Sequence, residues 1–316
     1  MQMNPSLLPK IKGENKYSSF EVQEKSCPEG MVPILKSKVA YNVKDSNSIS
    51  RVHLENIHPL TQTRPGSNFA GFKMKGDSTI YGAHAAITVH NPSVEKDQLS
   101  MSLITIEKGP PDDLNFIQAG WAVHPLIYGD NNTHITGYWT VSTGQTTGCY
   151  NLFCPGFVQV NPVYYLGQVI KGISIVGGNF YDTKHSIFLD QQTGNWWLLV
   201  DTYKIGYWPK ELFTHLNGGA EYIQYGGWTY NSPDSQLSPP MGIGLFPGGE
   251  INRNSSFFTY IQVAYKFNDF IDINGHKVER IVDNYTCYNA KYLGRQAGFF
   301  RETFSYGGPG GLCSGI

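Results

Sequence analysis

From about Tyr81 to the C-terminus, the sequence repeats one pattern of short β-branched or aromatic runs separated by turn residues. The clearest runs are AAITVHNP, LSMSLITIEKG, THITGYWTVST, FVQVNPVYYLGQ, SIFLDQQTGNWWLLVD, FFTYIQVAYKFND and YTCYNAKYLG. Each is partly alternating and bounded by Gly, Asn, Pro or Asp, as half-buried strands are. Only 16% of residues are charged, whereas Gly, Tyr and Phe are abundant, which favours sheets over helices. We therefore predict an all-β fold, an antiparallel β-sandwich of two stacked sheets preceded by a small N-terminal segment.

Two local patterns make more specific predictions. SIFLD and WWLLVD flank the short Gly-containing loop QQTGN, which predicts a β-hairpin. Successive side chains of a strand point to opposite faces, so Trp196 and Trp197 cannot lie in the same core. PKELFTHLNGGA (209–220) predicts about two helical turns, because Pro209 is suited to a helix start and Gly218 to its end.

The first 65 residues differ in texture from the rest. They are polar, contain only short strand-like pieces such as MVPILKSKVAYNV, and end in the turn-rich stretch TQTRPGSN. We predict two parts, 1–65 and 66–316, with the first packed on the sandwich. Exposed turn-rich boundaries are where proteolysis concentrates, so limited proteolysis should cut first near TQTRPGSN; first cuts inside 120–300 would contradict this.

Charge and motifs exclude several classes of protein. The net charge of −1 provides no basic field for binding nucleic acid. No 18-residue apolar run is present, so we expect no membrane span. The sequence contains no G-x-S-x-G elbow and no P-loop, and it lacks C-x2-C or H-x3-H ligand spacing. We expect no cofactor, no metal, no nucleic-acid or membrane partner, and a monomer.

The five cysteines favour an oxidising compartment. Cys149 and Cys154 enclose four residues, Cys287 and Cys313 flank the C-terminal stretch, and Cys27 is left alone. We expect the disulfides Cys149–Cys154 and Cys287–Cys313, with Cys27 unpaired, as in a secreted framework that lacks one partner. Three N-glycosylation sequons point the same way; they begin at Asn131, Asn254 and Asn284.

Aromatic residues are the remaining candidates for a binding site. Large rings could form the floor of a groove for a sugar or an extended peptide, but for any single ring filling the core of two sheets is the favoured explanation. The residues that we consider for such a groove are Trp121, Tyr128, Trp139, Tyr207, Trp208 and Tyr225.

Several strings resemble one known family. GWAVHPLIYGDNNTHITGYWT, TGCYNLFCPGFVQ, GNWWLLV, IGYWPKELF and YGGPGG occur here in the order found in the neprosin family of plant proteins, and CPEGMVPI resembles its activation peptide. The resemblance implies a secreted β-sandwich peptidase of the glutamic type, whose best-known members cleave after proline in acid. It also implies that 1–65 is the remnant of an activation peptide and that an absent upstream cysteine would pair with Cys27.

The family chemistry depends on two glutamates, and both are replaced. Carried over by motif, the first maps onto Gln118 of IQAGW and the second onto Trp228 of YGGWT. A glutamine can donate a hydrogen bond to an oxyanion, and a related class of glutamic peptidases uses a Gln–Glu pair. An indole neither accepts a proton nor activates water. Trp228 therefore resembles a ring that occupies a catalytic position.

Three functions follow as hypotheses. The first is a catalytically degenerate neprosin-like protein that binds Pro-rich peptides or cell-wall polymer. The second is an active, secreted glutamic endopeptidase that cleaves after proline at acidic pH with other acids. The third is a carbohydrate-binding β-sandwich. By resemblance we expect a secreted or vacuolar protein, with the missing signal peptide explained by a shortened gene model.

Overall fold

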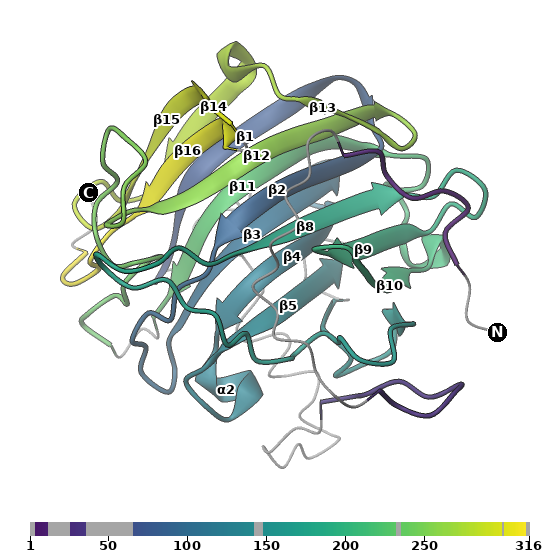
Figure 1. The fold of residues 1–316 in the computed structure, drawn as a ribbon, viewed down its shortest axis with the longest axis horizontal. Coiled ribbons are helices and arrows are strands. Elements are labelled where there is room, and N and C mark those ends of the chain that lie inside the picture. The colour runs from purple at the N-terminus through teal and green to yellow at the C-terminus, as the bar shows by residue number, and fades with distance from the viewer. Residues whose placement is uncertain are drawn as a thin grey trace.

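A computed structural model describes residues 4–11, 26–35, 66–141, 148–231, 235–298 and 300–313. They form two stacked antiparallel sheets (Figure 1), which confirms the predicted β-sandwich. In spatial order the seven-stranded sheet contains β14 (Val278–Val282), β1 (Ser67–Ile80), β11 (Ala220–Tyr230), β3 (Leu99–Lys108), β4 (Asn115–Val123), β5 (Thr133–Thr140) and β6 (Cys149–Tyr150). The nine-stranded sheet contains β15 (Asn289–Gln296), β16 (Arg301–Gly307), β12 (Ser256–Lys266), β2 (Gly82–Thr88), β8 (Asp182–Leu189), β9 (Trp196–Val200), β10 (Tyr203–Trp208) and β7 (Val158–Gln159), with β13 (Asp269–Asp272) paired to β12.

The seven-stranded sheet is covered on both faces. Along β4, Ile117, Ala119 and Trp121 belong to the main core between the sheets, whereas Phe116 and Ala122 belong to a second cluster on the outer face. All nine residues of β4 are buried. Because successive side chains alternate between faces, Gln118 lies on the outer face, away from the main core.

The hairpin prediction is confirmed. β8 and β9 pair antiparallel, with Phe188 opposite Trp197 and Leu189 opposite Trp196. Trp196 belongs to the core between the sheets, and Trp197 belongs to a separate cluster on the outer face of the nine-stranded sheet. The adjacent tryptophans therefore point to opposite faces, as strand alternation requires.

The helix predicted over 209–220 is wrong in extent. Only a 3-10 turn forms, at Lys210–Leu212, and β11 already begins at Ala220. The side-chain oxygen of Asn115 accepts hydrogen bonds at 2.8 Å from the backbone amides of Thr214 and His215. These tertiary bonds and the burial of Phe213 hold the segment against the sheet, and they replace the bonds that a second helical turn would make. The other described helices are the short α2 (Pro125–Tyr128) and the 3-10 turn Gly275–Lys277.

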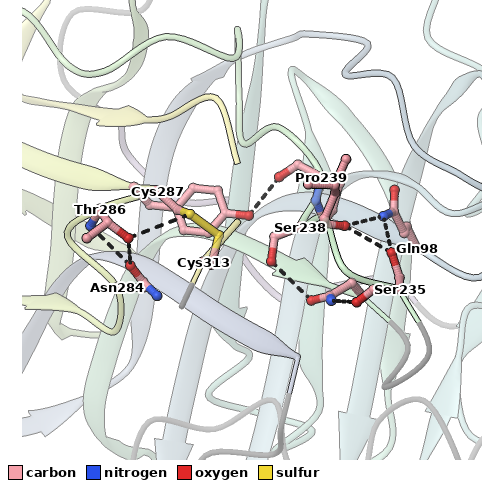
Figure 2. Close-up of a disulfide and its surroundings, with 11 residues drawn as sticks. Gln98, Ser235, Ser238, Pro239, Asn284, Thr286, Cys287 and Cys313 are labelled. Atoms are coloured by element: carbon pink, nitrogen blue, oxygen red, sulfur yellow. Dashed lines mark hydrogen bonds between the residues drawn. A yellow bond between two sulfur atoms is a disulfide. The ribbon is translucent and has the colours of Figure 1, made fainter. Parts of the chain in front are cut away.

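Both expected disulfides are present, Cys149–Cys154 and Cys287–Cys313. Figure 2 shows the second beside Asn284, whose side chain accepts hydrogen bonds from Thr286. Cys27 forms no disulfide within the described residues. No helix in these ranges is long and apolar enough to cross a membrane, and no group of three or more His, Cys, Asp or Glu residues there could hold a metal ion.

The two disulfides should differ in their effect on stability. Cys287–Cys313 closes a separation of 26 residues and Cys149–Cys154 one of five. In the chain-entropy model these loops correspond to about 3.5 and about 2 kcal/mol. We expect Cys287→Ser/Cys313→Ser to lower the free energy of unfolding more than Cys149→Ser/Cys154→Ser in urea titrations. The reverse order would show that native-state contacts, and not loop closure, dominate.

The described pieces of the N-terminal segment contact the sandwich. The backbone amide of Cys27 donates to Pro162 O at 2.9 Å, and Leu35 packs against the outer-face cluster of the seven-stranded sheet. Most of MVPILKSKVAYNV and of TQTRPGSN lies outside the described residues, and β1 begins at Ser67. The boundary near residue 65 stays a prediction.

Candidate functional site

Gln118 and Trp228 share the outer face of the seven-stranded sheet, but strand register does not bring them together. Gln118 lies opposite Thr105 of β3, which lies opposite Gln224 of β11. Trp228 lies opposite Met101 instead. Four residues separate Gln224 from Trp228 along β11, about 13 Å at roughly 3.3 Å per residue. The residue that faces Gln118 across β3 is therefore Gln224.

A phenylalanine ring fills the space between these two positions on β11. A Cβ atom added at Gly226 would meet the Phe69 ring at 2.5 Å, and one at Gly71 would meet the same ring at 2.7 Å. The ring thus lies directly over both glycines. It also contacts Trp228, with a centroid separation of 4.5 Å. Gly226 of YGGWT therefore serves close packing, because it leaves room for the ring that separates Trp228 from Gln224.

Trp228 is part of an apolar cluster on this face. It is 2% exposed and shares the cluster with Phe69, Leu99, Met101 and Tyr230. Its indole nitrogen is buried and has no hydrogen-bond partner in the described chain. The ring fills space in this cluster and supplies no acid, base or satisfied donor to it.

A row of polar side chains crosses the same face beside this cluster. We call it the polar row, and it contains Lys73, Thr105, Glu107, Gln118 and Gln224, which come from four adjacent strands. Lys73 Nζ lies 2.6 Å from Glu107 Oε1. Gln224 Nε2 donates to Glu107 Oε2 at 2.8 Å, and Gln118 Nε2 donates to Thr105 Oγ1 at 3.1 Å. Each member is less than 7% exposed.

The electrostatics of the polar row centre on Glu107. Burial raises the pKa of its carboxyl group, and this effect outweighs the lowering by the Lys73 cation and the Gln224 amide. Lys73 Nζ also lies 4.4 Å from the centre of the Tyr222 ring. Removing two charges from water costs several kcal/mol per ion. A buried ion pair is thus an expensive feature, and perturbed carboxyl groups of this kind mark candidate functional sites.

Sequence reasoning missed four members of the polar row: Lys73, Thr105, Glu107 and Gln224. The available signal was strand alternation, because β3 reads Met101, Leu103, Thr105, Glu107 along its outer face. When two buried polar residues follow apolar ones on the same strand face, they need hydrogen-bond or charge partners on the neighbouring strands. The identity of those partners depends on register, which a single strand does not reveal.

The six groove candidates do not line a common surface. Trp121, Trp139, Trp208 and Tyr225 lie in the core between the sheets. Tyr128 belongs to the outer face of the seven-stranded sheet, and Tyr207 to that of the nine-stranded sheet. All six tryptophans of the chain are at most 8% exposed. For four of the six candidates, filling the core is therefore the role that the structure shows.

The glycosylation candidates lie in turns. Asn131 and Asn254 are exposed and Asn284 is half-buried. Asn284 Oδ1 accepts hydrogen bonds from the backbone and hydroxyl of Thr286, the third residue of its own sequon. The exposed side chains of Asn131 and Asn254 leave room for a glycan in the folded protein.

Comparison with known proteins identifies a family. Among solved structures, the chain is similar to scytalido-glutamic peptidase bound to a peptide-based transition-state analogue, with a TM-score of 0.42, 13% identity and coverage of 76% of this chain and 97% of that one. It is also similar to SCP-B, a member of the eqolisin family of peptidases, in complex with the tripeptide Ala-Ile-His (TM-score 0.42, 12% identity, with the same coverage of both chains). The family model for Neprosin matches residues 96–309, more than half of the sequence. The protein belongs to the neprosin family.

Proposed function

We propose that this neprosin-family protein is catalytically degenerate and that the polar row binds an extended, proline-containing peptide without cleaving it. One observation carries the proposal: the residue facing Gln118 across β3 is a second glutamine, Gln224. Amide side chains cannot take a proton from water. Glu107 is the carboxylate of the polar row. One of its oxygens accepts a hydrogen bond from Lys73 and the other accepts one from Gln224.

The unpaired oxygen of Gln118 supports a peptide ligand. Gln118 Oε1 is buried and has no hydrogen-bond partner among the residues that the structure describes. An unsatisfied buried acceptor costs about 1–3 kcal/mol, and the backbone N–H of an extended peptide would satisfy it. Apolar residues flank the row on both sides, with Phe69 and Met101 toward Trp228 and Phe116 on β4 opposite Glu107. They suit the side chains of a proline-containing segment.

A peptidase assay tests the loss of chemistry, and a binding assay tests the ligand. The purified, processed protein should not cleave a proline-containing peptide above background at mildly acidic pH. It should bind that peptide, and Gln118→Met, which removes the acceptor while keeping the side-chain length, should weaken binding without changing the melting temperature. Binding that is unaffected by Gln118→Met would overturn the proposed site.

A second candidate function rests on the contact between Glu107 and Gln224. Their 2.8 Å hydrogen bond places a carboxylate beside an amide, the combination used by Gln–Glu peptidases. In this alternative, Glu107 takes a proton from water and Gln224 stabilises the oxyanion. Acid-optimum cleavage by the unmutated chain that disappears in Glu107→Gln would establish this candidate and reject degeneracy.

We also propose that the protein is secreted and glycosylated. The two disulfides fit an oxidising compartment, and the exposed Asn131 and Asn254 fit glycan attachment. Expression through a eukaryotic secretory pathway should give a mass that falls on enzymatic deglycosylation. Asn131→Gln/Asn254→Gln should remove most of that mass difference, and an unchanged mass would contradict glycosylation at these sites.

A further inference from the structure

The outer face of the nine-stranded sheet carries a second ordered set of aromatic residues. Phe270, Phe188, Trp197 and Tyr207 form one register-aligned line across β13, β8, β9 and β10, with Ala264 and Gly82 filling the positions on β12 and β2 between the first two. We call these four rings the aromatic row. Five strand intervals of about 4.8 Å give it a length of about 24 Å. The row is buried, and the Trp197 and Tyr207 rings lie 4.8 Å apart.

The small residues within the row let the rings spread over the sheet. A Cβ atom at Gly82 would meet the Phe270 ring at 2.7 Å and Phe188 Cβ at 3.2 Å. The Phe270 ring therefore occupies the space in which a side chain at Gly82 would stand. The result is a nearly continuous aromatic floor that runs perpendicular to the strands.

A segment of the chain itself crosses this floor. Asn4 Oδ1 accepts a hydrogen bond from Lys204 of β10 at 2.8 Å, and the Ser6 amide donates to Asp190, just after β8, at 2.8 Å. Lys204 precedes the row along β10, whereas Asp190 follows it along β8. β8 and β10 run in the same direction, so Lys204 and Asp190 lie on opposite sides of the row. Asn4 bonds to the first and Ser6 to the second, and the segment therefore crosses the row between Asn4 and Ser6.

The segment then continues to the far end of the aromatic row. The Lys10 amide donates to Asn268 O at 2.8 Å in the turn before β13, and Ile11 packs against the aromatic row. Figure 1 shows the segment in purple. Its anchors therefore follow the strand order β10, β8, β13, which is the order of the row itself.

The two prolines of this segment face the protein. Asn4–Ile11 reads NPSLLPKI, in which Pro5, Ser6, Pro9 and Ile11 are half-buried. Leu7 and Leu8 are 61% and 51% exposed. If burial of large apolar side chains alone had seated the segment, the leucines would face the sheet. The seated face is instead the one with the prolines, which restrict the unbound backbone and so lower the entropic cost of seating the segment.

The row also contains a hydrogen-bond donor of the kind used to bind such peptides. Trp197 Nε1 is buried and has no partner within the described residues, whereas Nε1 of the adjacent Trp196 donates to Leu216 O at 3.1 Å in the main core. Aromatic grooves that recognise proline-rich peptides combine flat rings with donors to the peptide carbonyls. Trp197 supplies a ring on the outer face, and its N–H, which the segment Asn4–Ile11 leaves unpaired, is a donor for a carbonyl of another peptide.

We propose that the aromatic row is a second peptide-binding site, which takes peptides with a Pro-x-x-x-Pro spacing. In this chain its occupant is the segment Asn4–Ile11. Once that segment is cleaved from the rest and dissociates, the same floor accepts a Pro-x-x-x-Pro segment of another polypeptide. This site lies on the opposite sheet from the polar row and does not depend on the function proposed for that row.

The test uses the full chain with a specific protease site introduced between residues 12 and 25 and cut after folding. Native mass spectrometry over a dilution series then gives the dissociation constant of the N-terminal fragment. We expect saturable retention, with Pro5→Ala/Pro9→Ala weakening it about tenfold through lost preorganisation. Leu7→Ser/Leu8→Ser changes two exposed residues of the same segment and should alter it by less than about twofold, since exposed contacts contribute little.

Changes in the body test the floor. Trp197→Leu removes the aromatic ring but keeps an apolar side chain, and it should weaken retention about three- to tenfold through lost ring contacts. Both the amide and the hydroxyl of Ser6 donate to Asp190. Asp190→Asn should therefore weaken retention of the normal fragment, and its further effect should be smaller when Ser6→Ala has already removed the hydroxyl bond. A labelled NPSLLPKI peptide added in excess should displace the fragment, while NASLLAKI should compete poorly.

Three results would overturn the proposal. The fragment could dissociate at every concentration with no binding of the labelled peptide. The leucine and proline substitutions could weaken retention equally, which would show ordinary apolar packing. Plant cell-wall oligosaccharides could displace the fragment where NPSLLPKI does not, which would make the floor a sugar-binding surface. Melting temperatures of the uncut variants would separate any loss of folding from loss of binding.

Discussion

Replacing both glutamines of the polar row by glutamate should give this protein an acid-optimum peptidase activity. Gln118→Glu/Gln224→Glu places two carboxyl groups on one row, separated by the short Thr105 side chain. Two nearby carboxylates share a proton at low pH because both cannot easily ionise. Restoring a positioned acid and base should raise the rate by about 10²–10⁴ over the unmutated protein. Cleavage of a proline-containing peptide, followed across the acidic pH range, measures the gain.

The matched control is Gln118→Glu/Trp228→Glu, which rebuilds the pair at the positions mapped from the family motifs. Register separates those positions by four residues along β11, and the Phe69 ring lies between Gln224 and Trp228. We expect no comparable gain from this variant. Strong activity in the control and none in Gln118→Glu/Gln224→Glu would show that Trp228 occupies the catalytic position and that the register argument is wrong. Thermal melts of both variants are needed, because burying an added carboxylate is costly.

Removing the partner of Glu107 should strongly destabilise the protein at neutral pH. Lys73→Met leaves a buried carboxylate without its cation, which typically costs about 3–5 kcal/mol. The pKa of Glu107 is already raised by burial, and losing Lys73 removes one influence that lowers it. A carboxyl group with a raised folded-state pKa opposes folding above that pKa, where it must be charged. The cost falls as pH drops through that pKa and disappears below the lower pKa of the unfolded state. The loss of stability should therefore be largest at neutral pH and smaller in acid.

Lys75 supplies the control for this experiment. It lies two residues further along β1 and pairs with Glu221 at 3.1 Å, but both side chains are largely solvent-exposed. Lys75→Met should leave the urea midpoint almost unchanged, because exposed ion pairs contribute little. Lys73→Met/Glu107→Gln should recover part of the lost stability by removing the unpaired charge. Equal effects of Lys73→Met and Lys75→Met would show that Glu107 is not held as a buried ion.

Local sequence patterns predicted much of the architecture. Alternating runs bounded by turn residues predicted the β-sandwich, and the QQTGN loop predicted the β8–β9 hairpin. Strand alternation placed Trp196 and Trp197 on opposite faces, and cysteine spacing predicted both disulfides. These features follow from the geometry of a few neighbouring residues, so the sequence contains the information that they require. The family motifs added the identity of the domain, which the Neprosin match confirms.

The failed helix over 209–220 shows where local patterns stop. Its start and end signals are present in the sequence, but Asn115, about 100 residues earlier, holds the backbone of Thr214 and His215. Tertiary bonds of this kind override a weak helical preference.

The candidate sites needed the tertiary structure for the same reason. Alternation along β11 gives Gln224 and Trp228 the same face, so the sequence can say that both are available but not which one lies opposite Gln118. That choice depends on inter-strand register. The pairing of Lys73 with Glu107 and the seating of Asn4–Ile11 on the aromatic row likewise depend on segments that are far apart in the chain. A shift of two residues between strands preserves every face assignment but changes every lateral neighbour. The sequence by itself therefore determined which side chains could meet, and only the packed sheets decided which of them do.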